Sequence, residues 1–173
     1  RINLTSIRSE EECITRHFGE SLYLGQYEHW TEHTRLVDVG TGSGFPGLAL
    51  KLIFPETPAM LLEPVAKKRA FLKEVIRACE IKNVAVRPER LDQFITLGEQ
   101  QSVLTARAVG NAAGIISHAR RVLEENGRLH LWLSRQQAEA LRQERLGVEW
   151  VRQVHVPLSD GREILTGILA PLS

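Results

Sequence analysis

The chain has 173 residues, of which 43% are hydrophobic and 25% are charged, and its formal net charge at pH 7 is +1. This length and composition predict a single domain over residues 1–173 with a full hydrophobic core, in which residues 1–34 form a helical N-terminal extension. A net charge so near zero excludes a uniformly basic nucleic-acid-binding protein, so any affinity for RNA has to come from a local patch.

The cysteine content and the length of the apolar runs restrict the cellular setting. Cys13 and Cys79 are far apart and show no metal-ligand spacing, which predicts reduced thiols and no metal site. No apolar run approaches the roughly 20 residues needed to cross a bilayer, and the N-terminal residues contain no signal-peptide core. We expect a monomeric, cytoplasmic protein without membrane association. Because the chain begins with arginine, we also expect further residues before it in the natural protein.

Hydrophobic periodicity predicts an α/β protein. In chain order, a helix over residues 10–26 precedes a series of short strands that are mostly separated by helices. The strands are expected at residues 36–39, 59–63, 84–87, 103–106, 128–133, 150–156 and 163–169. The clearest helix, residues 65–81, has Cys79 on its apolar stripe, which predicts that this thiol lies in the core.

The alternation of strands and helices predicts a mainly parallel sheet with helices on both faces. Such sheets bind ligands beyond the carboxyl ends of their strands. Only the turn-like segment PLSDGRE separates the last two strands, so these strands should form an antiparallel hairpin.

The segment LVDVGTGSGFPG, residues 36–47, predicts a buried strand that leads through a glycine-rich turn into a helix. Two ligand classes fit its glycines. Gly42, Gly44 and Gly47 match the GxGxxG of dinucleotide-binding folds, whereas Gly40, Gly42 and Gly44 match the GxGxG typical of turns that bind S-adenosylmethionine. The short chain and the terminal hairpin, which is typical of class I methyltransferases, favour the second interpretation.

Two carboxylates flank this turn. Asp38 is the last residue but one of the first predicted strand, and in the GxGxG phase it lies near the sulfonium or amino end of the ligand. Glu63 ends the second strand, nineteen residues beyond Gly44. A carboxylate at that position can accept hydrogen bonds from both ribose hydroxyls of a nucleoside.

The chain resembles one protein family in the order and spacing of INLTSIR, RHFGESL, LVDVGTGSGFPGLALKLIFPE, LLEPVAKKRAFLKEV, RPERLDQF and ARAV. This is the RsmG (GidB) family of bacterial methyltransferases, which use S-adenosylmethionine to modify the N7 position of a guanine in small-subunit (16S) ribosomal RNA. The resemblance is strong from Ile2 to about Ala108 and then weakens. It implies a Rossmann-like class I S-adenosylmethionine-dependent methyltransferase fold, S-adenosylmethionine as cofactor, and small-subunit ribosomal RNA or the assembling subunit as partner.

The resemblance also implies the donor-binding residues. Asp92 would accept a hydrogen bond from the adenine amino group, Leu91 would offer its backbone N–H, and Phe45 would form an apolar wall. Arg107 would pair with the donor's carboxylate or with an RNA phosphate and so position the reactants; a structural ion pair is the alternative. The predicted cofactor site is Gly40, Gly42, Gly44, Phe45, Glu63, Leu91, Asp92 and Arg107.

Methylation of guanine N7 needs no general base, because N7 carries an in-plane lone pair and no proton. The enzyme has only to align donor and acceptor. Amino-group methylation would call for a motif such as NPPY after the fourth strand, where this chain has ARAVGN. Covalent methylation of a pyrimidine carbon would need a cysteine in the pocket, and both cysteines lie in predicted helices. The residues favour a nucleophile that is already competent, such as guanine N7, or a small-molecule substrate.

Basic side chains near the predicted mouth of the pocket are candidates for RNA contact. The set comprises Arg16, His17, Arg90 and Arg135, in addition to Arg107. Lys67 and Lys68 are further cations, for which a solvated helix face is an equal alternative.

Two positions depart from the family's pattern. Where most members have lysine followed by glycine, this chain has Ser134 and Arg135; where the family's last hairpin reads GERH, this chain reads GREI, so that Glu163 takes the arginine position and Arg162 lies one residue earlier. A one-residue shift in a strand turns a side chain to the opposite face. Two further hypotheses stay open: a diverged member that binds the donor but has another acceptor or none, and a dinucleotide-dependent oxidoreductase.

Overall fold

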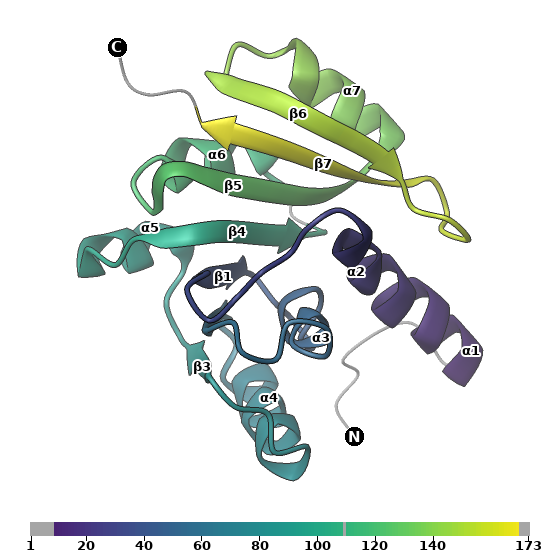
Figure 1. Cartoon of the computed structure of the whole chain (residues 1–173), viewed down its shortest axis with the longest axis vertical. Coiled ribbons are helices and arrows are strands. Elements are labelled where there is room, and N and C mark those ends of the chain that lie inside the picture. Colours follow the sequence, from purple (N-terminus) through teal and green to yellow (C-terminus); the bar gives the residue numbers. More distant parts are fainter. Residues whose placement is uncertain (1–8, 109, 170–173) are drawn as a thin grey trace.

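The structure, a computed structural model, describes residues 9–108 and 110–169 (Figure 1). Its N-terminal part is one continuous run of helical turns, in which Ser9 caps the first turn by accepting a hydrogen bond from the N–H of Glu12 at 3.1 Å. The segments are α1 (Glu10–Cys13), the π-helical η1 (Ile14–Gly19), α2 (Glu20–Leu22) and the 3₁₀-helical η2 (Tyr23–Gln26). The helix predicted over residues 10–26 is therefore confirmed.

The described residues form a seven-stranded sheet in the order β3-β2-β1-β4-β5-β7-β6. Figure 1 shows β3 at one end of the sheet and the β6–β7 hairpin at the other. The strands are β1 (Leu36–Val39), β2 (Ala59–Leu62), β3 (Val84–Arg87), β4 (Gln101–Arg107), β5 (Leu123–Ser134), β6 (Val148–His155) and β7 (Arg162–Leu169). Strands β1 to β5 pair in parallel, and β7 is antiparallel to both β5 and β6. The predicted mainly parallel sheet with a terminal hairpin is confirmed.

Helices cover both faces of the sheet, as predicted. Side chains of β5 alternate between the faces: Leu131 packs with Ile116 of α6, whereas Trp132 packs with Leu24 and Leu50. The first face carries α5 (Leu91–Phe94), η3 (Ile95–Leu97), α6 (Ala112–Ala119) and α7 (Arg135–Gln143). The second face carries the N-terminal helices, α3 (Gly47–Leu50) and α4 (Ala66–Ala78).

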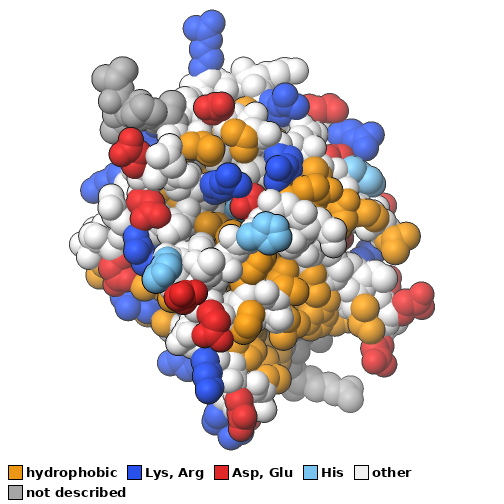
Figure 2. All heavy atoms as spheres, viewed as in Figure 1, with side chains coloured by type: hydrophobic (Ala, Val, Ile, Leu, Met, Phe, Trp, Pro, Cys, Tyr) orange, Lys and Arg blue, Asp and Glu red, His pale blue; other side chains and the backbone are white. Residues whose placement is uncertain are grey.

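The prediction that Cys79 lies in the core is wrong. Helix α4 ends at Ala78, so Cys79 follows the last helical turn and is exposed. Together with Cys13 it lines an apolar groove of about 480 Å³ between α3, α4 and the N-terminal helices. Figure 2 shows hydrophobic side chains gathered on this side of the molecule. Val75 and Ile76 of α4 are partly buried and pack against the core formed by Leu48, Leu61 and Leu72, whereas Cys79 lies beyond the helix at the open groove.

Candidate functional site

The carboxyl ends of the parallel strands lie at one edge of the sheet. The strand register aligns Val39 at the end of β1 with Leu62 and Ala106. The residues that follow these three, Gly40, Glu63 and Arg107, therefore lie at this edge, as the sequence predicts. The start of β7 joins them, because Arg162 pairs with Ser134 at the end of β5. The edge therefore collects residues from the glycine turn, from the second strand and from the terminal hairpin.

The glycine turn adopts left-handed backbone conformations. Gly40, Gly42 and Gly44 have φ angles of 67°, 62° and 103°, which side chains disfavour. A Cβ atom added to Gly40 would meet no atom within 4 Å, and one added to Gly42 would meet only the Gly40 carbonyl oxygen, at 3.9 Å. The space beside Gly40 and Gly42 is open and fits a ligand that binds against the backbone, whereas a Cβ atom on Gly44 would lie 2.9 Å from Cβ of Leu48.

Asp38 is hydrogen-bonded to the end of the glycine turn. Its Oδ2 accepts a hydrogen bond from the N–H of Gly47 at 2.9 Å, and its Oδ1 accepts one from the hydroxyl of Thr105 at 2.7 Å. Complete burial raises the pKa of Asp38, and these hydrogen bonds oppose that effect. A Cβ atom on Gly47 would lie 2.6 Å from the Asp38 side chain. Both carboxylate oxygens thus accept hydrogen bonds that stabilise the fold. The position of Asp38 near the sulfonium of the donor stays a prediction from the sequence.

Glu63 joins the turn to the loop after β2. Its Oε2 accepts a hydrogen bond from the N–H of Gly42 at 3.0 Å, and its Oε1 accepts one from the N–H of Val65 at 2.8 Å. The side chain is buried, so the carboxylate is fixed in place. Each oxygen has a second lone pair, which leaves acceptors for the ribose hydroxyls that the sequence predicts.

The predicted adenine-binding residues follow β3. Leu91 is the first residue of α5 and is buried, whereas Asp92 is exposed. The N–H of Arg90 donates a hydrogen bond to Oε1 of Gln93 at 3.1 Å, which fixes the start of the helix. Because β3 is parallel to β2 and ends beside it, the segment that follows β3 and leads into α5 starts at the edge that also carries the turn.

Two rings of the N-terminal helix cover Phe45. The ring of His17 stacks on Phe45 with centroids 4.7 Å apart and an interplanar angle of 17°, and Phe18 meets Phe45 edge to face at 5.0 Å. Burial, followed by the positive charge of Arg107, lowers the pKa of His17. The sequence predicts Phe45 as an apolar wall, and the structure makes it part of an aromatic cluster.

Arg107 anchors the N-terminal helix to the end of β4. Its Nη2 donates a hydrogen bond to the carbonyl oxygen of Arg16 at 2.7 Å and lies 3.2 Å from Oε2 of Glu20. Nη1 lies 3.4 Å from both the carbonyl oxygen of His17 and the hydroxyl of Ser21. The structural ion pair that the sequence leaves open is present. Sequence reasoning missed Glu20, although an acidic residue inside the RHFGESL motif is a visible signal.

The two positions that depart from the family's pattern have roles within the fold. Ser134 caps α7, because its hydroxyl accepts a hydrogen bond from the N–H of Gln137 at 3.2 Å. Glu163 is buried and lies 3.2 Å from Nε of Arg135 and 3.4 Å from Nδ1 of His155. Arg135, a predicted RNA contact, is therefore oriented by an ion pair.

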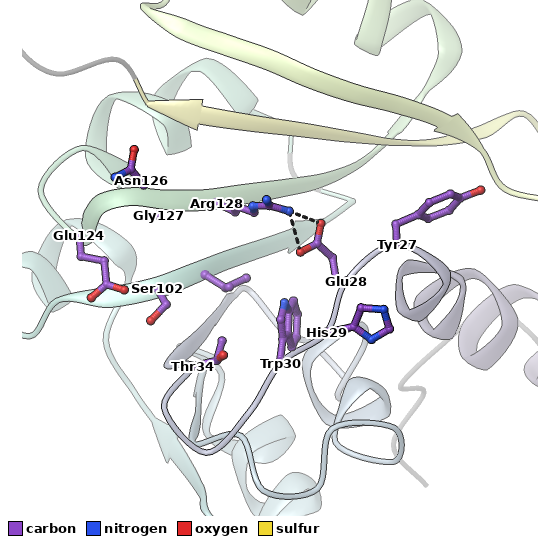
Figure 3. Close-up of a pocket in the computed structure, with 11 residues that line it drawn as sticks. Tyr27, Glu28, His29, Trp30, Thr34, Ser102, Glu124, Asn126, Gly127 and Arg128 are labelled. Carbon is purple, nitrogen blue, oxygen red and sulfur yellow. Dashed lines mark hydrogen bonds and ion pairs between the residues drawn. The ribbon is translucent and has the colours of Figure 1, made fainter.

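A second pocket, of about 410 Å³, lies at the opposite edge of the sheet, beside the first residues of β4 and β5 (Figure 3). Its buried carboxylate, Glu28, accepts hydrogen bonds from Nη1 of Arg128 at 2.8 and 3.0 Å. No residue predicted for the donor site lines it. Within the described ranges, no three His, Cys, Asp or Glu side chains are placed to hold a metal ion, and no helix has the length and apolar character to cross a membrane.

Solved structures define the class of this fold. A fibrillarin–Nop5p complex matches with a TM-score of 0.73 and 16% identity over 89% of this chain and 81% of that chain. A ribosomal protein L11 methylase from Lactobacillus delbrueckii matches with a TM-score of 0.73 and 13% identity over 88% of this chain and 77% of that chain. The protein has the fold of class I S-adenosylmethionine-dependent methyltransferases.

Sequence comparison then gives the family. The family model GidB, rRNA small subunit methyltransferase G, matches residues 1–164, and the chain belongs to this family. The protein named ribosomal RNA small subunit methyltransferase G is 39% identical in Chloroflexus aggregans over 132 residues, 75% of this chain and 55% of that protein. Its Escherichia coli namesake is 32% identical over 171 residues, 97% of this chain and 80% of that protein.

This chain spans about half the length of several curated relatives that it matches. The family and the fold do not favour the dinucleotide-dependent oxidoreductase that the literal GxGxxG suggests. The GxGxG phase of Gly40, Gly42 and Gly44 is the one consistent with both.

Proposed function

We propose that this protein transfers a methyl group from S-adenosylmethionine to N7 of a guanine in small-subunit ribosomal RNA, as naked RNA or within the assembling subunit. The observation that carries the proposal is the left-handed glycine turn, which is open above Gly40 and tied through Gly42 to Glu63. Membership of the rRNA small subunit methyltransferase G family supports the choice of donor and acceptor.

When bound, S-adenosylmethionine supplies a methyl group activated by its sulfonium. The protein's part is to bind and align, because guanine N7 gives up no proton. The turn would hold the donor against its backbone, and Glu63 would accept the ribose hydroxyls. Asp92 and the N–H of Leu91 would bind the adenine, with Phe45 as the apolar wall.

Arg107 would act as a positioning residue. Its side chain is only 11% exposed and is held by Glu20 and by carbonyl oxygens of the N-terminal helix. A guanidinium fixed in this way presents a positive charge at the edge that carries the turn, where it can balance the donor's carboxylate. The proposed reaction requires no general base, so none is assigned to His17.

A matched pair of glycine variants tests the donor site. Gly40 and Gly98 have similar φ angles, 67° and 70°, and an added Cβ meets no atom within 4 Å at either position, so Gly40→Ala and Gly98→Ala carry a similar backbone strain. We expect Gly40→Ala to lower the affinity for S-adenosylmethionine at least tenfold in calorimetry and Gly98→Ala to leave it unchanged. Equal affinities would contradict the proposed donor site.

The acceptor is tested with labelled donor and unmodified small-subunit ribosomal RNA, followed by mapping of the methyl group. We expect one labelled guanine, methylated at N7. Absence of donor binding by the wild-type protein would refute the proposed function as a whole.

A diverged family member that binds the donor but has another acceptor, or none, is the second candidate. It is favoured by one observation: Ser134 and Glu163, which stand where the family has cations, are engaged in a helix cap and an ion pair. Donor binding without labelling of small-subunit ribosomal RNA would select it. Labelling of that RNA from a strain that lacks the enzyme would exclude it.

A further inference from the structure

Arg162, Arg107 and Glu20 form a charged cluster at the carboxyl edge of the sheet. Nε of Arg162 and Nη2 of Arg107 lie 3.6 Å and 3.2 Å from the same oxygen, Oε2 of Glu20. The side chain of Glu20 is 5% exposed, that of Arg107 is 11% exposed and that of Arg162 is 29% exposed. Two guanidinium groups share one buried carboxylate, so these three side chains together carry one net positive charge, and Asp38 is a further carboxylate that acts on Arg107.

The two arginines differ in how fully their donors are used. Arg107 donates to backbone carbonyls of the N-terminal helix and approaches Ser21. The guanidinium of Arg162 makes no hydrogen bond within the part of the chain that the structure describes, and its buried Nε is without one. A buried donor without a partner costs stability. Because the buried Nε faces Glu20, the donors of Arg162 that remain for a ligand are those of Nη1 and Nη2, in a side chain that is 29% exposed.

The neighbouring acidic groups do not neutralise Arg162. The alternation of β7 turns the adjacent Glu163 away, into ion pairs of its own. Asp160 lies 3.7 Å from Arg16, and its side chain is 93% exposed, so water and salt screen it. The planar donor fork of an arginine matches a phosphate group, and this fork is partly open to solvent.

The strand order separates the roles of the two arginines. Arg107 ends β4, which is next to β1 and its glycine turn, whereas Arg162 begins β7, two strands further along the sheet. The cation nearer the turn suits the donor's carboxylate, and the outer, more exposed cation suits the acceptor. Glu20, which contacts both, fixes their orientation relative to each other.

We propose that Arg162, oriented by Glu20, binds a backbone phosphate of the acceptor RNA. This assignment rests on the proposed function, because it takes RNA to be the acceptor. In this chain the cation of the terminal hairpin is Arg162, one residue before Glu163, which stands at the position of the arginine in the family's GERH pattern. The strand turns Arg162 toward the site and Glu163 away from it.

The test compares Arg162→Gln with Arg142→Gln, which removes the same charge from an exposed arginine on α7 that donates to Gln153. The probe is unmodified small-subunit ribosomal RNA, titrated at several KCl concentrations. We expect Arg162→Gln to weaken RNA binding about tenfold and to reduce the salt slope of log K by roughly 0.7–0.9. Arg142→Gln should change neither quantity, and the Kd for S-adenosylmethionine should stay the same in both variants.

Arg162→Lys provides a second variant, which keeps the charge but lacks the fork. It should retain the salt slope and lose part of the affinity. If Arg162→Gln leaves both the RNA affinity and its salt slope unchanged, the assignment is overturned. It is also overturned if Arg162→Gln weakens the binding of S-adenosylmethionine and leaves RNA binding intact. If the wild-type protein binds this RNA but does not methylate it, the proposed function fails, while a reduced slope in Arg162→Gln still supports the phosphate contact.

Discussion

The proposed donor side and the proposed acceptor side of the sheet edge are held together by different kinds of contact. On the donor side, Asp38 and Glu63 accept hydrogen bonds from backbone N–H groups of nearby loops. On the proposed acceptor side, Arg162 meets Glu20 of the N-terminal helix, and the same carboxylate joins it to Arg107, so three distant segments meet through charge. The backbone contacts of Asp38 and Glu63 follow from the spacing of nearby residues in the sequence. The ion pairs of Glu20 form only when the N-terminal helix packs against the sheet.

Removing the charge of Arg107 is expected to have the largest effect. In Arg107→Gln the buried carboxylate of Glu20 keeps, among the residues that the structure describes, only the ion pair with Arg162 at 3.6 Å. The free energy of unfolding should therefore fall by about 3 kcal/mol. The rate of methyl transfer should fall by about 100-fold, because positioning is lost. Urea unfolding and single-turnover kinetics measure the two effects.

The double variant Glu20→Gln with Arg107→Gln separates stability from activity. It removes the unpaired buried charge, so part of the stability should return while the rate stays low. A methyl-transfer rate that matches the wild-type rate in Arg107→Gln would remove Arg107 from the site and leave it a structural anchor.

A substitution under the turn tests the donor side. In Gly47→Ala the new Cβ would lie 2.6 Å from the Asp38 side chain and 2.7 Å from that of Leu61, and we expect unfolding to become easier by about 2 kcal/mol. Gly110→Ala is the control, because a Cβ there meets no atom within 4 Å. Equal melting temperatures of the two variants would show that the backbone of the turn shifts to accommodate the added Cβ atom without a loss of stability.

The difference between the two sides also explains what the sequence could predict. The strands, the hairpin and the left-handed turn follow from alternation and glycine spacing, which are local properties. The Glu20–Arg107 and Arg135–Glu163 pairs depend on which strand ends and helices meet in the folded chain. Cys79 was misplaced for a related reason, since a periodic stripe on a helix does not show whether another element covers it.

One acceptor-side feature was within reach of the sequence. Ser134 followed three residues later by Gln137 has the spacing of a capping box, and the structure contains both of its hydrogen bonds. A serine at that position therefore starts a helix, and this role is independent of any loss of a cation that contacts RNA.

Acid should weaken the core that both sides share. His130 is fully buried, its Nδ1 lies 3.0 Å from the hydroxyl of Thr166, and burial lowers its pKa to about 3. Between this value and the unfolded pKa of 6.5, the unfolded chain binds the extra proton, so stability falls as the pH falls.

From pH 7 to pH 5 the loss from this group should be about 2 kcal/mol. His130→Gln, which cannot titrate there, should flatten the dependence of the unfolding free energy on pH by that amount. An unaltered pH dependence would assign acid sensitivity to the ion pairs of the acceptor side instead.

The smallest expected effect belongs to Asp92. Because this side chain is exposed, Asp92→Ala should change the free energy of unfolding by less than about 0.5 kcal/mol. Asp92 is proposed to accept a hydrogen bond from the adenine amino group, so its removal should weaken the binding of S-adenosylmethionine about tenfold in calorimetry. Glu139→Ala, which removes an exposed carboxylate on α7, is the control. If the two variants bind the donor equally, the turn and Glu63 alone define the donor side, and α5 contributes only its buried face.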